Sequence, residues 1–216
     1  IASTVRANPS AGFSIVTYTS PNSSSSQSFG HGLNVKPGLV IVKNRDSSYN
    51  WDIYHSSLGY NSSLIFTSTS TRSGAFSSEP TSTAVNTSNS YTHNGTDKYV
   101  AYCFAPVEGY SAMGLYNGGS DAFVYLGFKP ALLIVKRTNG TGNWLIYDNA
   151  RGEYNLNGNG LYANLNNQEF TSSSEGYDFL SNGFKVRNNY SDGDASGGTY
   201  IYLAFAENPF KTARAS

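Results

Sequence analysis

The sequence predicts an all-β protein made of two tandem, internally duplicated β-sandwich units related by a pseudo-twofold axis. The first observation is a repeat: KPGLVIVKNRDSSYNWDIYHSSLG at residues 36–59 returns as KPALLIVKRTNGTGNWLIYDNARG at residues 129–152, with eleven of 24 positions identical. The second is periodicity, because apolar residues in both copies occur in short runs or in strict alternation, which is typical of strands. A period of about 95 residues suits a small sandwich domain and is too long for a solenoid repeat.

The duplication extends beyond this opening match. Upstream, AGFS at residues 11–14 pairs with EGYS at 108–111, and downstream YVAYCFAP at 99–106 pairs with YIYLAFAE at 200–207. The spacing drifts only across segments rich in Gly, Ser and Asn, as insertions in surface loops would. We therefore predict four segments: an N-terminal flank at residues 1–11, one sandwich unit at 12–106, a second at 109–209, and a C-terminal tail at 210–216.

Each unit is expected to contain a hairpin at the repeated stretch. The runs LVIV and LLIV, which start at Leu39 and Leu132, are typical of strands covered on both faces. Each leads through a polar turn into NWDIY or NWLIY, where a second strand would place Trp51 and Trp144 at matching inward positions. We interpret both tryptophans as core residues.

The last strand of each unit alternates large and small residues. In residues 99–105, Val100, Tyr102 and Phe104 alternate with Ala101, Cys103 and Ala105, and residues 200–206 repeat the pattern. This alternation predicts a strand with large side chains on one face and small ones on the other. GFKVRN at residues 183–188 follows an SNG turn and predicts a further strand. No stretch of ten or more residues has helical apolar spacing with caps, so any helices should be short.

Residues that draw attention as catalytic or metal-binding candidates have simpler interpretations. Cys103 is the only cysteine and lies on the small-residue face, so we expect a buried thiol acting as a small hydrophobe. The spacing of His31, His55 and His93 matches no zinc pattern, and His55 corresponds to Asp148 in the second copy, which favours an exposed position. The loop SDGDASGG at residues 191–198 lacks the closing bidentate acid of a calcium loop and predicts a tight turn. We therefore expect no metal and no cofactor.

Charge argues against nucleic acid as a partner, and the short apolar runs argue against a membrane. The chain has 14 basic and 14 acidic residues and no net charge, so it lacks the electrostatic footprint of a nucleic-acid-binding protein. Its apolar runs are only a few residues long, so we expect no membrane insertion. The 14% aromatic content argues against disorder in a chain this rich in Ser, Asn, Thr and Gly.

Several stretches carry a resemblance to a known family. They are AGFSIVTYT, FGHGLNVKPGLVIVKNR, YVAYCFAPVEGYS, FVYLGFKPALLIVKR, FLSNGFKVR and GGTYIYLAFAENPFK, which together span about residues 12–211. They resemble a domain of unassigned function found near the C-terminus of large, tail-fibre-like virion proteins of tailed, often marine, bacteriophages. The resemblance implies a phage structural protein in the virion or an extracellular surface appendage, with other virion proteins as partners and a homo-oligomeric, by preference trimeric, state.

Two functions stay open at this point, and neither is enzymatic. The first is a virion structural and adhesion module, which needs sandwich units, polar loops and no catalytic cluster. The second is a carbohydrate-binding domain for host surface glycans, in which aromatic rings near Asn-rich loops stack on sugars. The tyrosines that we predict as glycan contacts are Tyr49, Tyr54, Tyr147, Tyr154 and Tyr162. An enzyme that cleaves polysaccharide would need two carboxylates across a groove, and the two copies share no acidic position that marks such a pair.

Overall fold

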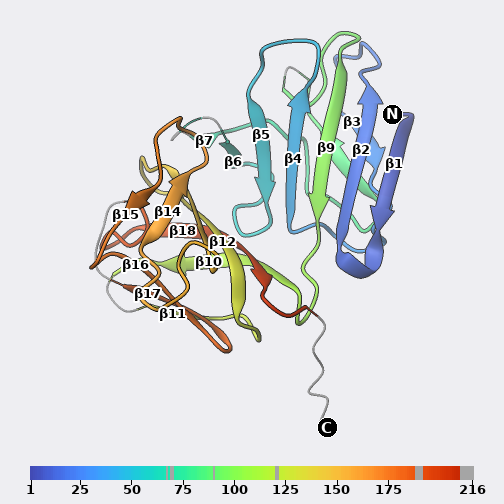
Figure 1. The fold of residues 1–216 in the computed structure, drawn as a ribbon. Helices are drawn as coiled ribbons and strands as arrows, with labels where there is room; N and C mark the ends of the chain where they lie inside the picture. Colours follow the sequence, from blue (N-terminus) through green and yellow to red (C-terminus); the bar gives the residue numbers. More distant parts are fainter. Residues whose placement is uncertain (67, 69–70, 90, 120–121, 188–191, 210–216) are drawn as a thin grey trace, which may run out of the picture. The chain divides into compact units, whose positions relative to one another are not determined.

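The computed structural model describes the whole chain except residues 67, 69–70, 90, 120–121, 188–191 and 210–216. The class is all-β, as predicted: the described residues form antiparallel sheets, and their only helical element is a 3-10 turn at Pro9–Ala11. The chain divides into two compact units, Ile1–Pro106 and Val107–Ser216 (Figure 1). Each unit has its own hydrophobic core.

Unit 1 contains a seven-stranded and a two-stranded sheet. The order in the large sheet is β1-β2-β9-β4-β5-β6-β7, and β3 pairs with β8 in the small one. The strands are β1 (Ser3–Asn8), β2 (Phe13–Thr19), β3 (Gln27–Gly30), β4 (Leu39–Asn44), β5 (Trp51–His55), β6 (Ser63–Ile65), β7 (Thr71–Arg72), β8 (Ala84–Thr87) and β9 (Lys98–Phe104).

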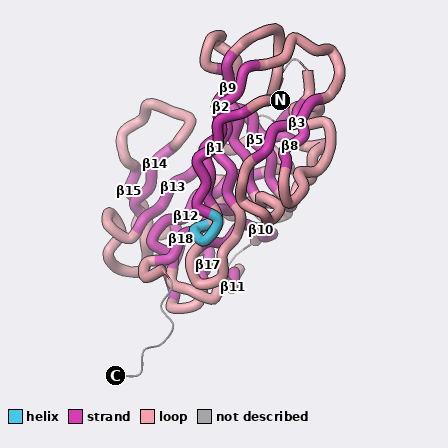
Figure 2. The backbone as a smooth tube through the Cα atoms, turned by 90° about the vertical axis from the view of Figure 1, so that its right-hand side faces the viewer, coloured by secondary structure: helices cyan, strands magenta, loops and turns pink. Residues whose placement is uncertain are grey.

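The small sheet of unit 1 covers one face of the large sheet, which gives the unit two layers (Figure 2). Phe29 of β3 and Val85 of β8 are buried in the same cluster as Val16, Val40 and the other inward residues of the large sheet. Burial of these apolar side chains between two layers is the main source of stability that this geometry offers.

Unit 2 contains a six-stranded and a three-stranded sheet. The orders are β10-β18-β12-β13-β14-β15 and β11-β17-β16. The strands are β10 (Ser111–Asn117), β11 (Phe123–Tyr125), β12 (Pro130–Arg137), β13 (Trp144–Asp148), β14 (Asn159–Tyr162), β15 (Phe170–Thr171), β16 (Gly176–Leu180), β17 (Gly183–Arg187) and β18 (Thr199–Ala206). Phe184 and Val186 of β17 pack with Leu133 and Val135 of β12 in its core.

The two large sheets follow the same order of connection. With β1 set aside, each large sheet starts with β2 or β10 and continues with the last strand of its unit, β9 or β18. The two strands of the repeated hairpin come next, followed by two short strands. The strands of the hairpin, β4 with β5 and β12 with β13, pair in equivalent registers, because Trp51 lies opposite Lys43 and Trp144 lies opposite Lys136. A shared order is what a duplication would produce; the duplication itself and the pseudo-twofold stay predictions.

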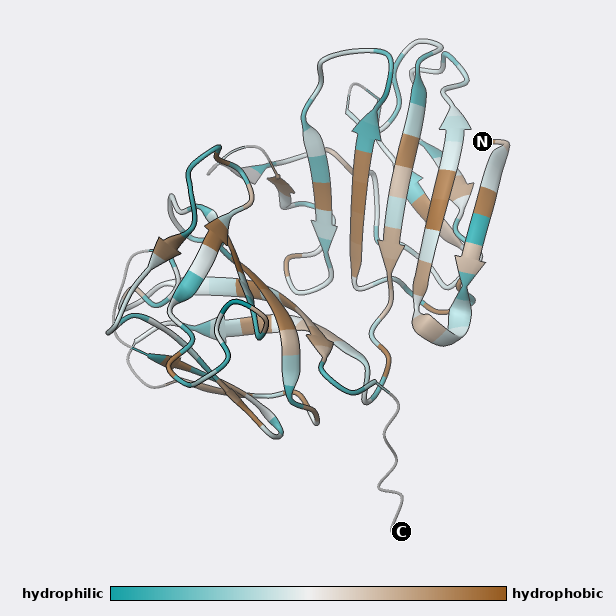
Figure 3. Cartoon of the chain, viewed as in Figure 1, coloured by the Kyte–Doolittle hydropathy of each residue, from teal (hydrophilic) through white to brown (hydrophobic). Residues whose placement is uncertain are grey.

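The predicted strands of the hairpin are present, but their inward face was assigned wrongly. Figure 3 shows β4 and β12 apolar along most of their length, as expected for interior strands. Trp144 is buried, as predicted, and Trp51 is half-buried, but neither belongs to the clusters between the two sheets, which instead contain Tyr54 and Tyr147 from the other face. Because both faces of these strands carry apolar residues, their periodicity could not decide which face meets the small sheet.

The repeated lysine of the hairpin closes its turn. In unit 1 the Lys43 Nζ donates hydrogen bonds to the carbonyl oxygens of Asn44, Ser47 and Tyr49, at 2.8, 3.3 and 2.7 Å. In unit 2 the Lys136 Nζ donates to the carbonyl oxygen of Arg137 at 2.6 Å, and burial lowers the pKa of Lys136 to about 8. The ammonium group therefore binds the carbonyl at the end of the first hairpin strand in both units and, in unit 1, two carbonyls of the turn that follows, which gives the repeated Val-Lys step a structural role.

The N-terminal flank belongs to the fold. Residues 1–11 lack core patterning and lie outside the predicted repeat, yet β1 pairs with β2 over six residues, so the compact unit starts at Ile1. The C-terminal tail, residues 210–216, lies outside the described residues.

Candidate ligand-binding surfaces

Two of the five tyrosines predicted as glycan contacts, Tyr54 and Tyr147, are buried, so the prediction is wrong for them. Tyr54 is 0% exposed and packs edge-on against Phe76, and Tyr147 is 1% exposed and packs against Phe170 and Tyr177. Their positions at the inner face of β5 and β13 make them core residues, so neither ring can stack on an external sugar. The Tyr54 hydroxyl donates a hydrogen bond to Glu79 at 2.6 Å.

The other three predicted tyrosines reach the surface to different degrees. Tyr154 is 77% exposed and Tyr49 is 41% exposed. The Tyr49 hydroxyl accepts a hydrogen bond from Asn94 at 3.1 Å, which ties the ring to the loop between β8 and β9. Tyr162 is half-buried and lies against Phe170, with ring centroids 4.7 Å apart. Tyr49 and Tyr154 belong to different units, and neither has a second exposed aromatic neighbour among the large exposed residues of its own loop.

The thiol and the histidines are structural groups. Cys103 is buried and free of disulfides, as predicted, and burial raises its pKa to about 12, so it stays protonated. The expected exposure of His55 is wrong, because His55 is 0% exposed and its Nδ1 accepts a hydrogen bond from the amide of Ser57. His31 and His93 are also buried. Within the described part of the chain, no three His, Cys, Asp or Glu side chains gather as metal ligands.

The acidic loop after β17 accepts hydrogen bonds from two other loops. Asp192 accepts hydrogen bonds from the amide and the side chain of Asn143, at 3.2 and 3.0 Å, and Asp194 accepts one from the amide of Gly119 at 2.8 Å. Residues 192–198 form turns, as predicted, while Ser191 lies outside the described residues.

A buried carboxylate lies in the interior of unit 1. Asp52 on β5 faces the core, is 0% exposed, and forms an ion pair with Arg72 at 3.0 Å. Neither of its oxygens has a hydrogen-bond partner among the described residues, and burial raises its pKa to about 6, although Arg72 and Lys43 oppose the rise. A perturbed carboxyl is often catalytic, but this one is enclosed and a substrate has no access to it.

The most exposed pair of neighbouring aromatics lies on the small sheet of unit 2. Phe123 and Tyr125 are two residues apart on β11, so they share one face, and they are 49% and 69% exposed. Val124 between them packs against the core. Sequence reasoning missed this pair, although the alternation Phe-Val-Tyr carries it: an inward valine places both rings outward.

A lysine and a glycine of the neighbouring strand lie beside this aromatic pair. Lys185 lies directly opposite Phe123, and Gly183 lies opposite Tyr125. Any side chain at Gly183 would collide with the carbonyl oxygen of Val124, so this close approach of strands requires glycine. One strand further, Asp178 lies opposite Lys185 and pairs with Arg187 at 3.0 Å. Two rings therefore stand beside both donors and acceptors of hydrogen bonds. We name Phe123, Tyr125, Lys185, Asp178 and Arg187 the aromatic face.

The matching place in unit 1 has a different chemistry. On β3, Ser28 and Gly30 flank the buried Phe29, so no aromatic ring is presented there. The large sheets of the two units share a strand order apart from β1, whereas the small sheets differ in strand number and in the side chains that they expose.

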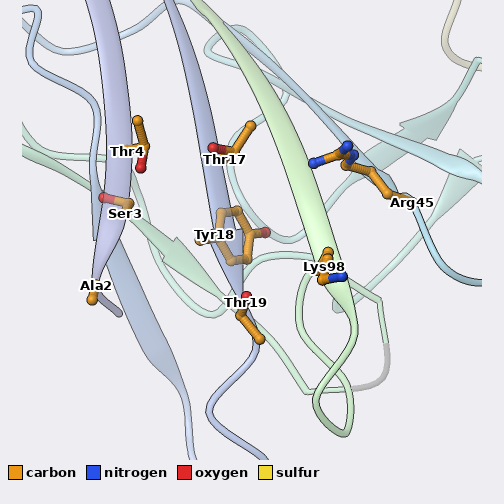
Figure 4. A pocket seen from close by; sticks show the side chains of 8 residues that line it. All are labelled: Ala2, Ser3, Thr4, Thr17, Tyr18, Thr19, Arg45 and Lys98. Atoms are coloured by element: carbon orange, nitrogen blue, oxygen red, sulfur yellow. The ribbon is translucent and has the colours of Figure 1, made fainter.

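A polar hollow of about 320 Å³ lies on the large sheet of unit 1 (Figure 4). Its lining is Ala2, Ser3, Thr4, Thr17, Tyr18, Thr19, Arg45 and Lys98. Apart from the edge of Tyr18, whose ring is 4% exposed, the lining offers hydroxyl and cationic groups.

Comparison with known proteins places the chain in a family. Residues 1–209 match the model of a domain of unknown function, DUF7483, and the chain belongs to that family. No curated protein and no solved structure matches it. Among the described residues no helix has the length and apolar character needed to cross a membrane.

Proposed function

We propose that this DUF7483 protein is a non-enzymatic adhesion module of a phage virion, in a tail fibre or another surface appendage, and that it binds host surface glycan at the aromatic face. The virion assignment rests on the resemblance of its sequence stretches to phage tail-fibre-like proteins. The glycan assignment rests on one observation, the exposed pair Phe123 and Tyr125 on an open sheet.

The chemistry of the aromatic face fits a sugar. Aromatic rings stack on the apolar C–H faces of pyranose rings, and neighbouring charged groups hydrogen-bond to the hydroxyls. Lys185 donates, and the Asp178–Arg187 pair offers both an acceptor and donors. Such a site combines an apolar platform with a few placed polar groups, which is the usual composition of small-ligand sites.

The size of the apolar area argues against a protein partner at this face. A stable protein interface buries about 800 Å² on each side. Here the apolar surface ends after two rings, because the next strand presents Gly183 and Lys185. That width suits one or two sugar residues.

A glycan array with the protein and its Phe123→Ser/Tyr125→Ser variant tests the proposal. We expect glycans that bind the wild type to lose at least about ten-fold in affinity in the variant, since stacked aromatic rings are typical binding hot spots. Tyr154→Ser is the matched control, because Tyr154 is exposed in the same unit but lies outside the aromatic face. Equal binding by the wild type and the double variant would contradict the assignment of the face.

A purely structural role is the second candidate. It is favoured by the exposed edge of β11, which is the first strand of its sheet and could pair with another chain. We expect the protein to form a homo-oligomer, and by the resemblance a trimer, in light-scattering measurements at micromolar concentration. A monodisperse monomer would contradict this expectation, and absence of any glycan binding would favour the scaffold role.

A further inference from the structure

We propose that the polar hollow on unit 1 is a second binding site, selective for an anionic sugar that carries a carboxylate, such as a uronate or a sialate. The residues that would bind the carboxylate are Arg45 and Lys98. This site is separate from the aromatic face and does not depend on it.

The strand register gathers these side chains from four strands. Thr19 of β2 lies opposite Lys98 of β9, and the amide of Arg45, just after β4, donates to the carbonyl oxygen of Lys98 at 2.8 Å. Partners that face each other across antiparallel strands project from the same side. Thr19, Lys98 and Arg45 therefore form one row on the face opposite the small sheet.

A second row supplies hydroxyl groups. Thr4 of β1 lies opposite Thr17 of β2, two residues before Thr19, so both threonines share the face of the first row. Figure 4 shows the side chain of Arg45 extending across β9 toward Thr17. The hollow thus has a cationic side near Arg45 and Lys98 and a hydroxyl-bearing side near Thr4, Thr17 and Thr19.

Among the described residues, neither the guanidinium group of Arg45 nor the ammonium group of Lys98 forms an ion pair with an acidic side chain. Of the nearest acids in sequence, Asp97 accepts from Asn44 and Ser47, and Asp46 accepts from the backbone amide of Lys98 at 2.8 Å, so Asp46 lies beside the hollow without lining it. Two like charges held on one face repel each other, and an anion placed between them is attracted by both.

The same face carries more basic groups than acids. Arg6 of β1 and Lys43 of β4 project from it by the same alternation, and no strand residue on the face from β1 to β5 is acidic. In a chain without net charge, this is a local concentration of positive charge. It would raise the local concentration of an anionic polymer near the hollow.

The lining selects the class of anion. A carboxylate accepts two parallel hydrogen bonds from a guanidinium group, and sugar hydroxyls exchange hydrogen bonds with threonine hydroxyls. The hollow exposes no aromatic face on which a nucleic-acid base could stack, which disfavours single-stranded nucleic acid. Its volume of about 320 Å³ is at the lower end of small-molecule sites, which suits a single sugar residue of a longer chain.

Isothermal titration calorimetry with two carboxylate sugars, trigalacturonic acid and sialyllactose, tests the proposal on the full chain. The methyl ester of trigalacturonic acid is the matched neutral ligand, and inorganic phosphate reports whether any small anion suffices. The variants are Arg45→Gln/Lys98→Gln for the site and Arg6→Gln as a control, since Arg6 shares the face but does not line the hollow. Thermal denaturation of each variant checks that the fold is retained.

We expect at least one carboxylate sugar to bind, the methyl ester to bind at least ten-fold more weakly, and the double variant to lose at least ten-fold in affinity. Arg6→Gln should weaken binding by less than about three-fold, because it removes only a salt-screened charge outside the hollow. Phe123→Ser/Tyr125→Ser should keep wild-type affinity, so failure here is distinguishable from failure of the aromatic face. The proposal is overturned if neither carboxylate sugar binds, if the ester binds equally well, or if the double variant is unaffected. Binding of phosphate as tight as that of the sugars would reduce the hollow to a general anion site and overturn the sugar assignment.

Discussion

Replacing Asp52 by Asn should make unit 1 less sensitive to pH. Asp52 is 0% exposed in the core of unit 1, where Arg72 balances its charge but no described group hydrogen-bonds its oxygens. Burial raises the pKa of Asp52 from 3.8 to about 6. The folded state therefore holds the carboxyl proton more tightly than the unfolded state does.

The size of the effect follows from the shift. A rise of about two units, at 1.36 kcal/mol for each, corresponds to about 3 kcal/mol. Because the folded pKa is the higher one, this stability is fully present below about pH 3.8 and is lost as the pH rises through about 6. About 2 of the 3 kcal/mol fall between about pH 4.5 and about pH 7.5.

Urea unfolding at these two pH values measures the effect in unit 1. In a Trp144→Phe background the only remaining tryptophan is Trp51, so its fluorescence reports unit 1 alone. We compare the free energy of unfolding of the protein that has Asp52 with that of its Asp52→Asn variant. We expect the difference, the first minus the second, to fall by about 2 kcal/mol from the lower to the higher pH. The fixed cost of placing an amide at this position cancels in that comparison.

Glu79→Gln is the control of opposite sign. Burial pushes the pKa of Glu79 upward, but hydrogen bonds from Lys36, Tyr54 and the amide of Tyr60 outweigh it and leave the pKa lowered. The stability that Glu79 contributes is therefore lost as the pH falls. A difference between Asp52 and Asp52→Asn that stays constant across the pH range would refute the buried, poorly hydrogen-bonded state of Asp52.

Two further predictions concern groups that sequence and structure both single out. Cys103→Ala should cost at most about 1–2 kcal/mol, because it removes one buried atom; rapid labelling of the native protein by a thiol reagent would contradict its burial. Lys43→Met should destabilise unit 1 by about 1–2 kcal/mol, because the carbonyl at the end of β4 and two carbonyls of the turn lose a charged donor. Urea unfolding followed by Trp51 fluorescence measures this, and an unchanged midpoint would show that water replaces the ammonium group without cost.

The strands of the repeated hairpin could be predicted because their evidence is local. The runs beginning at Leu39 and Leu132 became the interior strands β4 and β12, and the alternation around Cys103 became β9. Period-two patterns record the pleat of a single strand, so a short window of sequence contains them. Burial of Cys103 followed from the same alternation.

The glycan-contact tyrosines were predicted less well, because a sequence window does not say which face of a strand meets another layer. Tyr54 and Tyr147 were assigned to the surface and are core residues, whereas Phe123 and Tyr125 were overlooked and are exposed. Each of these rings has an apolar neighbour on its strand that could equally have faced inward: Ile53 precedes Tyr54, Ile146 precedes Tyr147, and Val124 lies between Phe123 and Tyr125. Position relative to the opposing sheet, not composition, decides the exposure of such residues.

By itself, the sequence of this protein determined the all-β class, the repeated hairpins with their turns, and the strands β9, β17 and β18, since these depend on residues close along the chain. Only the tertiary structure decided which strands pair and which side chains become neighbours. It added β1 to the edge of the large sheet, and it brought Thr4, Thr19, Arg45 and Lys98 to one hollow. The physical reason is that strands distant in sequence pair where burial of their inner faces requires it, and the side chains on their outer faces become neighbours as a consequence.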